Sequence, residues 1–235
     1  MKRLPLFVYI VCNVLIMRAE PQEKVQQICS QISCQQLQAI TPENSGTLKD
    51  RIKHYFDSGT YNAAVECVAN ELINYLKTLL PVGDKKLALV FDIDETCLSN
   101  WPFILRNDFG YNRYRFRAWE MLGKAPAIPA MRTAYQFAVD NGFSIFFITG
   151  RREAIKCSTK RNLMRQGFKQ WNQLYCKPDN YSGYSAIDYK QKARADIVKQ
   201  GYTIVANIGD QQSDLSGEFP GERRFSMPNP LYMIP

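Results

Sequence analysis

The chain has 235 residues, of which 46% are hydrophobic and 12% aromatic, and its 30 Lys and Arg against 22 Asp and Glu give a net charge of +8. This composition is typical of one folded domain with an appendage and excludes a largely disordered chain. The sequence holds a single histidine, His54. One histidine is too few for three classes of enzyme. These are hydrolases with a histidine nucleophile and a second histidine as acid, metallophosphatases with several histidine ligands, and zinc deaminases. We therefore expect any chemistry to rest on carboxylates, lysine, hydroxyls or thiols.

The N-terminus has the order of a secretory signal peptide over residues 1–19. Two basic residues precede a 14-residue apolar run, Leu4–Met17, and Arg18 and Ala19 follow it. A membrane span needs roughly 20 apolar residues, so a single-pass anchor is the weaker alternative. We expect an exported protein without stable membrane insertion after cleavage. Its destination would be periplasmic or extracellular, or vacuolar or lysosomal in a eukaryote.

Six of the seven cysteines remain once the signal peptide is removed: Cys29, Cys34, Cys67, Cys97, Cys157 and Cys176. An even number of cysteines in an exported protein permits disulfides. Six cysteines allow 15 connectivities, among which Cys29–Cys34 and Cys157–Cys176 are the local candidates. No CxxC pair occurs and no histidine stands near a cysteine, which disfavours a zinc site of these residues.

Residues 20–84 are expected to form an N-terminal arm and helical extension. Residues 20–50 are polar and rich in glutamine, which predicts a loosely structured arm or short helices. From Tyr61 to Leu80, apolar residues recur at helical spacing and predict one amphipathic helix. We expect this helix to dock on the main domain.

Residues 85–235 are expected to form the main domain. Three nearly continuous apolar runs predict strands that are covered on both faces, at 87–94, 143–149 and 202–208. Helical stretches stand between these runs, at 130–141, 153–166 and 188–200. Strands and helices in alternation predict an α/β fold, a Rossmann-like open parallel sheet with helices on both faces.

Each predicted strand ends in polar residues: Asp92 and Asp94 at the first, Thr149 before Gly150 at the second, and Asp210 and Asp214 just after the third. Ligands of open α/β sheets bind beyond the carboxyl ends of the strands, so we expect these residues to converge on one crevice, which Lys190 can join. Alternation sends Asp92 and Asp94 to the same side of an extended strand. Two carboxylates at such a short distance repel each other unless a cation lies between them or one of them is protonated.

These residue types fit phosphate chemistry. Asp92 and Asp210 suit Mg²⁺, with waters and a substrate phosphate completing its octahedron. Asp94 can then be kept protonated as a general acid. Lys190 and Thr149 supply a cation and a hydroxyl donor for the non-bridging phosphate oxygens.

Four segments in this order carry a family resemblance: FDIDET, ITGRRE, the YK of DYKQKAR, and NIGDQQSDL. They resemble the four motifs of the haloacid dehalogenase superfamily, in the class B acid phosphatase subgroup that includes plant acid phosphatases and vegetative storage proteins. Flanking segments such as KAPAIPAM and RRFSMPNPLYMIP extend the resemblance to roughly residues 50–235. It implies an acid phosphatase that hydrolyses phosphomonoesters through an aspartyl-phosphate, with Mg²⁺ as cofactor.

The resemblance also implies a role for each site residue. Asp92 takes the place of the nucleophile and Asp94 that of the general acid and base. Thr149, Gly150 and Lys190 take phosphate-binding places. Asp92, the backbone carbonyl of Asp94, and Asp210 take the places of metal ligands, which Asp214 supports from behind. The family usually has serine after the lysine, whereas Gln191 stands here, so Lys192 is the alternative to Lys190.

The segment 100–129 mixes aromatic with basic residues. Such a mixture can bind nucleic acid, but an exported protein seldom meets that partner. Where this superfamily inserts a cap after its first motif, the segment would shade the site. Its aromatics would either hold the organic part of a small phosphomonoester or pack the insert against the sheet. We expect Arg151 and Arg152 to be surface charges.

Two rivals to the phosphatase remain at this stage. One is a storage or binding protein without useful turnover on the same scaffold, although Asp92 is present here and some storage-protein relatives lack it. The other is an enzyme that hands the phosphoryl group to an alcohol. The sequence leaves the natural substrate and the presence of a homo-oligomer open.

Overall fold

The computed structural model describes residues 42–183 and 185–234. The predicted signal peptide, most of the arm and the Cys29–Cys34 pairing lie outside these residues. None of the helices in the described ranges is long and apolar enough to cross a bilayer. From Lys49 onward the chain forms one compact unit.

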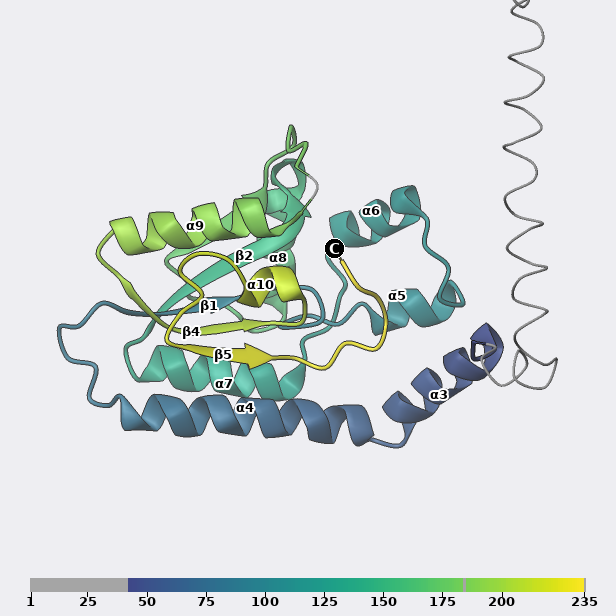
Figure 1. Cartoon of the computed structure of the whole chain (residues 1–235), viewed down its shortest axis with the longest axis horizontal. Coiled ribbons are helices and arrows are strands. Elements are labelled where there is room, and N and C mark those ends of the chain that lie inside the picture. Colours follow the sequence, from purple (N-terminus) through teal and green to yellow (C-terminus); the bar gives the residue numbers. More distant parts are fainter. Residues whose placement is uncertain (1–41, 184, 235) are drawn as a thin grey trace, which may run out of the picture. The chain divides into compact units, whose positions relative to one another are not determined.

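Five parallel strands form a single sheet in the order β3-β2-β1-β4-β5. They are β1 (Leu87–Phe91), β2 (Ser144–Arg152), β3 (Gln173–Lys177), β4 (Thr203–Gly209) and β5 (Arg223–Ser226) (Figure 1). The three predicted runs are β1, β2 and β4, which confirms the open parallel α/β sheet. The two edge strands were not predicted, because β3 and β5 are short and carry polar residues that give no continuous apolar run.

The described helices are α3 (Ser45–Asp57), α4 (Thr60–Thr78), α5 (Trp101–Arg106), α6 (Arg113–Leu122), α7 (Pro129–Asp140), α8 (Lys156–Arg165), α9 (Ile187–Lys199) and α10 (Gln212–Leu215). The stretches predicted to be helical correspond to α4, α7, α8 and α9. Local signals fix the ends of α6: the Asn112 side chain accepts hydrogen bonds from the first amides of the helix, and Gly123 ends it with a φ of 60°.

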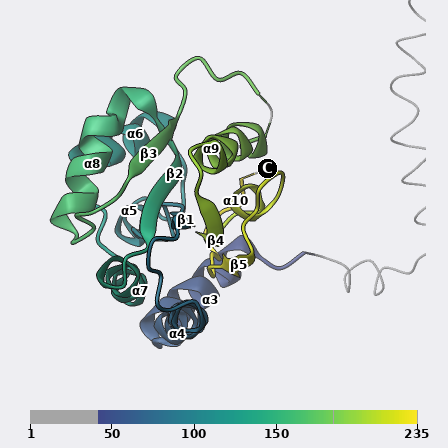
Figure 2. The same ribbon diagram turned by 90° about the vertical axis from the view of Figure 1, so that its left-hand side faces the viewer.

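Helices cover both faces of the sheet, as predicted (Figures 1 and 2). Side chains of β1 alternate between two hydrophobic cores. Leu89 and Phe91 lie in the core that α4, α7 and α8 share. Ala88 and Val90 lie in the core beneath α9. A strand buried on both sides carries apolar residues at every position, which is the pattern that the sequence shows.

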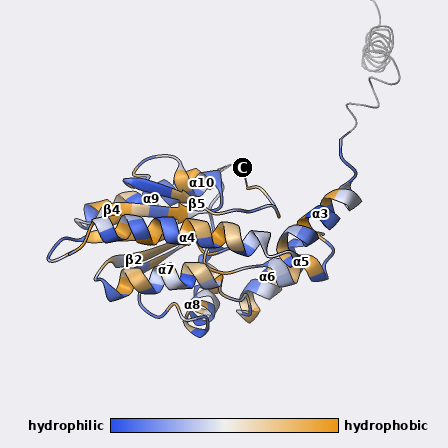
Figure 3. Cartoon of the chain, turned by 90° about the horizontal axis from the view of Figure 1, so that it is seen from below, coloured by the Kyte–Doolittle hydropathy of each residue, from blue (hydrophilic) through white to orange (hydrophobic). Residues whose placement is uncertain are grey.

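The helix α4 packs against α7 and against the edge strand β5, so the predicted docking of this helix is confirmed. Its buried side chains lie one or two turns apart: Tyr61, Val65, Ala69, Leu72 and Leu76. Figure 3 shows hydrophobic and hydrophilic residues in repeating bands along the helix. The helical extension is therefore part of the main hydrophobic core.

The Cys157–Cys176 pairing, one of the two local candidates, is not formed. Both thiols are free, as are those of Cys67 and Cys97. Cys157 is exposed on α8, whereas Cys176 on β3 faces the core. Burial raises the pKa of Cys176 to about 12, so this thiol is inert at ordinary pH.

Replacement of Leu72 by alanine tests the place of α4 in the core. Leu72 is fully buried, so Leu72→Ala should lower the free energy of unfolding by about 3 kcal/mol through lost burial and the cavity left behind. Urea unfolding of the purified chain measures this change. Asn74→Ala, at an exposed position of the same helix, is the control. A loss below about 1 kcal/mol for Leu72→Ala would show that α4 is not anchored in the core.

Candidate active site

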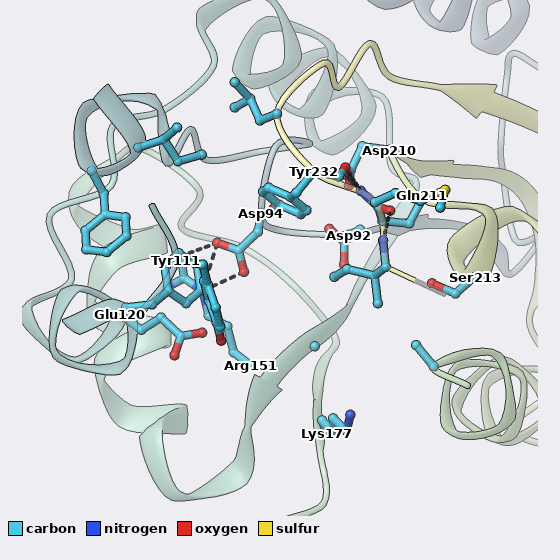
Figure 4. A pocket seen from close by; sticks show the side chains of 18 of the residues that line it. Asp92, Asp94, Tyr111, Glu120, Arg151, Lys177, Asp210, Gln211, Ser213 and Tyr232 are labelled. Atoms are coloured by element: carbon cyan, nitrogen blue, oxygen red, sulfur yellow. Dashed lines mark hydrogen bonds and ion pairs between the residues drawn. The ribbon is translucent and has the colours of Figure 1, made fainter. Parts of the chain in front are cut away.

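The carboxyl ends of β1, β2 and β4 open into one cavity of about 400 Å³. Asp92 and Asp94 follow β1, Gly150 and Arg151 belong to β2, Asp210 follows β4, and Lys190 comes from α9. Figure 4 shows the labelled carboxylates of Asp92, Asp94 and Asp210 around this space. The ends of the three predicted strands therefore meet at one cavity, as expected from the sequence.

Asp92 lies at the bottom of the cavity, only 6% exposed. Lys190 Nζ donates a hydrogen bond to Asp92 Oδ1 over 3.1 Å and pairs with Asp214 on its other side. Burial, with help from the charge of Asp214, raises the pKa of Asp92 well above its ordinary range, although Lys190 opposes the shift. Burial lowers the pKa of Lys190, but the two aspartates raise it further, so the lysine stays charged. Lys192 is exposed and does not line the cavity, whereas Lys190 does.

Asp92, Asp210 and Asp214 each offer a carboxylate oxygen within 4.8 Å of the others. Gly209 permits this approach, because a Cβ at that position would lie 2.2 Å from the Cβ of Asp214. Burial and Asp214 raise the pKa of Asp210 to about 6. The described residues place one cation, Lys190, among these carboxylates. A hard divalent cation would suit such a cluster of oxygen donors.

Asp94 is held by Arg151, which reverses the prediction that Arg151 is a surface charge. Arg151 is 1% exposed, and its Nε and Nη2 atoms donate to the Asp94 carboxylate over 2.7–3.2 Å. Asn100 Nδ2 donates to Asp94 Oδ1 over 2.9 Å. Figure 4 shows Asp94 and Arg151 pointing toward one another.

This pairing also changes the expected protonation state of Asp94. Burial raises the pKa of Asp94, but the charge and hydrogen bonds of Arg151, joined by Asn100, outweigh burial and lower it. The carboxylate form is therefore favoured in the free protein, contrary to the expectation that Asp94 is kept protonated. Arg152, by contrast, donates to a backbone carbonyl of Asp179 over 2.6 Å and does not line the cavity.

Thr149 is fully buried at the end of β2, and Gly150 lines the cavity beside it. The Thr149 hydroxyl oxygen accepts a hydrogen bond from the Arg151 amide over 3.1 Å, which leaves its own proton to donate. Gly150 lines the same cavity as Asp92 and Lys190, whereas Thr149 does not line it.

The C-terminal segment 227–234 ties the loops of the site together. Asn229 Nδ2 donates to Asp210 Oδ2 over 2.7 Å, and Tyr232 Oη donates to Glu95. Asn100 donates to the same Glu95 carboxylate, and Trp119 Nε1 on α6 donates to Asn100 Oδ1 over 2.7 Å. These hydrogen bonds connect the end of the chain, the loop after β1 and the helix α6.

Segment 100–129 forms another wall of the cavity through α5 and α6. Phe103, Phe109, Tyr111 and Phe116 line it, and Phe103 also packs edge-on against Phe116. Glu120 of α6 lies at this wall with 8% exposure. Aromatic residues of this segment therefore line the cavity, and Phe103 and Phe116 also pack against each other within the segment.

Several residues of the site escaped the sequence analysis: Glu95, Asn100, Glu120, Arg151 and Tyr232. Arg151 and Tyr232 bind Asp94 and Glu95, which lie 57 and 137 residues away along the chain, so no local spacing marks these pairs. For Arg151 a signal existed, because it stands two residues after Thr149, where alternation returns a side chain to the same face of the strand.

Comparison with known proteins decides the family. Residues 18–235 match the model of the HAD superfamily, subfamily IIIB (acid phosphatase). The chain belongs to this family. Membership confirms the resemblance that the four motifs gave, and with it the enzyme class of acid phosphatase.

Relatives of this acid phosphatase family include both enzymes and storage proteins. Acid phosphatase 1 of Solanum lycopersicum is 35% identical, over 79% of the chain and 74% of the relative. Vegetative storage protein 2 of Arabidopsis thaliana is 35% identical, over 80% of the chain and 72% of the relative. The class C acid phosphatase from Bacillus anthracis superposes with a TM-score of 0.65 at 25% identity, covering 79% of this chain and 86% of that one.

The pH dependence of stability tests the burial of Glu120. Burial and Asp94 raise the pKa of Glu120 to about 7, even though Arg117 lies 3.7 Å away. A carboxyl with a raised pKa binds its proton more tightly in the folded chain, so it makes stability fall as pH rises from about 4.5 to 7. In Glu120→Gln the free energy of unfolding should therefore decrease less steeply with pH over this range, the slope changing by less than about 1.4 kcal/mol per pH unit.

Urea unfolding with a chelator, at several pH values, measures the slope. Glu153→Gln, at an exposed position, controls for the loss of a carboxyl as such. A Glu120→Gln slope equal to that of the unmodified chain would contradict the burial of an ionisable group at this wall.

Proposed function

We propose that the chain is an exported, magnesium-dependent phosphatase that hydrolyses small phosphomonoesters through an aspartyl-phosphate on Asp92. The observation that carries the proposal is the buried Asp92–Lys190 pair after β1, in a cavity that Gly150 also lines. Within it, residues 85–235 form the catalytic domain, with 100–129 as its cap, and residues 20–84 form the extension. Residues 1–19 are the signal peptide that directs export.

Asp92 is the nucleophile of the proposed reaction. Lys190 binds Asp92 Oδ1, and no described residue forms a hydrogen bond to Oδ2 in this structure, so Oδ2 is the oxygen that attacks phosphorus. A bond forms between this oxygen and phosphorus while the bond to the leaving oxygen breaks in line. Thr149, Gly150 and Lys190 hold the non-bridging oxygens, where positive charge and donors stabilise the transition state.

Asp94 moves the protons. In the first step it must give a proton to the leaving oxygen, and in the second it takes one from the water that attacks the phosphorylated Asp92. Arg151 favours the ionised Asp94, which suits the second step directly. The first step needs a proton on a carboxyl of lowered pKa, and an acidic medium supplies it. Arg151 therefore positions Asp94 and favours an acidic optimum.

The residues present fit a magnesium ion. Asp92 and Asp210 would hold it with the backbone carbonyl of Asp94, while Asp214 supports the arrangement through Lys190 and the Gln211 amide. The buried like charges of this donor set call for a further cation besides Lys190. When bound, Mg²⁺ would neutralise phosphate charge and orient the ester.

The similarity to vegetative storage proteins supports one alternative, a chain that keeps the scaffold without useful turnover. Transfer of the phosphoryl group to an alcohol instead of water is the other. Assay of the mature chain with and without chelator separates the first from the enzyme. A new phosphate ester formed in the presence of a competing alcohol would reveal the second.

Asp92→Asn tests the proposed nucleophile. The amide cannot form the acyl phosphate, so kcat should fall at least 10³-fold on any phosphomonoester while the fold is retained. Release of phosphate from an aryl phosphate in the presence of magnesium measures this loss, and circular dichroism checks the fold.

His54→Gln is the matched control, because His54 is exposed on α3 and lies outside the cavity. It should keep nearly full activity. Substantial turnover by Asp92→Asn would reject Asp92 as the nucleophile, and a large loss in His54→Gln would reopen the choice of catalytic groups.

A further inference from the structure

Three residues that line the cavity each have a buried polar atom without a hydrogen-bond partner: Arg151 Nη1, Tyr189 Oη and Ser213 Oγ. Buried polar groups in proteins are nearly always hydrogen-bonded, so atoms of this kind in a cavity indicate a ligand. Arg151 belongs to the side of the cavity where Asp94 lies. The proposed reaction gives Tyr189 no role.

Tyr189 lies beside the expected phosphate position. It stands in the first turn of α9 and is 7% exposed. A Cβ at Gly150 would lie 3.5 Å from Tyr189 Oη, so the hydroxyl faces the backbone next to Thr149. Other buried tyrosines give their hydroxyl proton to the protein: Tyr135 donates to the Gln170 carbonyl over 2.6 Å.

Lys177 brings a positive charge to the same side. It lines the cavity from the end of β3, and its Nζ lies 5.7 Å from the ring centre of Tyr189 and 4.9 Å from that of Tyr181. Among the described residues, no carboxylate pairs with Lys177. Figure 4 shows it at the end of the cavity away from Tyr232 and Asp210.

The charges around Lys177 favour an anion. Burial, and the positive charges of Arg152 and Lys190, lower the pKa of Lys177. Ala186, at the N-terminal end of the 13-residue helix α9, also lines the cavity, and a helix N-terminus attracts negative charge. Asp188, the acidic residue of this turn, accepts a hydrogen bond from the Tyr181 hydroxyl over 3.4 Å.

We propose that Lys177, Tyr189 and the first turn of α9 form a subsite for a second anionic group on the substrate. This inference rests on the proposed function and narrows it. The favoured substrates would be phosphomonoesters whose leaving group carries a carboxylate or a second phosphate. The transferred phosphate would lie at Thr149 and Gly150, and the second anion would reach Lys177 past Gly150.

The subsite is tested with ligands that differ in one charge. Carboxybenzyl phosphonate and carbamoylbenzyl phosphonate have nearly the same shape, are not hydrolysed, and place the test group at the meta or para position. Calorimetry of the full mature chain with magnesium should give about tenfold tighter binding of the carboxylate ligand, the usual size of one charge-assisted hydrogen bond. Propane-1,3-bisphosphonate and propylphosphonate form a second pair, which distinguishes phosphate from carboxylate as the preferred anion.

Lys177→Gln should bring the affinity ratio of each pair close to one, and Tyr189→Phe should reduce it. The matched controls are Lys160→Gln, exposed on α8, and Tyr175→Phe, whose hydroxyl already donates to Asp196; both should keep the ratio. A ratio near one in the unmodified chain for both pairs would overturn the inference. So would equal losses of affinity for both members of a pair in Lys177→Gln, because Lys177 would then bind the transferred phosphate itself. Failure of the proposed function would appear separately, as no turnover of any aryl phosphate by the same preparation.

Discussion

The site depends on one constraint: several carboxylates are buried close together at the carboxyl edge of the sheet. Asp92, Asp210 and Asp214 lie within 4.8 Å of one another, and burial raises the pKa of Asp92 and of Asp210. Like charges at this distance repel, and removal from water adds to the cost. Lys190, between Asp92 and Asp214, offsets part of it. The remaining excess of negative charge is what a bound divalent cation would relieve.

The surroundings separate the roles of the two carboxyls after β1. Asp92 shares Lys190 with Asp214, whereas Asp94 receives hydrogen bonds from both Nε and Nη2 of Arg151. Environments that push two pKa values apart are the usual means of dividing catalytic roles between like residues. The hydrogen bonds of Tyr232 and Asn229 then hold the loops after β1 and β4 to the end of the chain. These hydrogen bonds come from a C-terminal segment that lies outside the four motifs.

Much of this arrangement could be predicted from sequence, for physical reasons. The central strands bury both faces, so their apolar runs mark them, and the polar residues that follow mark the edge where they meet. Asp92, Thr149, Lys190 and Asp210 were placed together in this way. The burial of Arg151 was not predicted, because a charged residue is expected at the surface unless a buried partner for it is known. The edge strands and the Cys157 and Cys176 thiols likewise depend on contacts distant in sequence, which spacing does not encode.

The measurement that tests the central claim most directly is thermal unfolding with magnesium and with chelator. If buried repulsion at the strand ends is what the ion relieves, Mg²⁺ should raise the Tm of the mature chain by about 5 °C or more at saturation. Asp210→Asn removes one of the like charges, so it should melt above the unmodified chain in chelator and gain little from Mg²⁺. An unmodified chain whose Tm is the same in magnesium and in chelator, or an Asp210→Asn chain that is less stable in chelator and responds fully to Mg²⁺, would contradict the account.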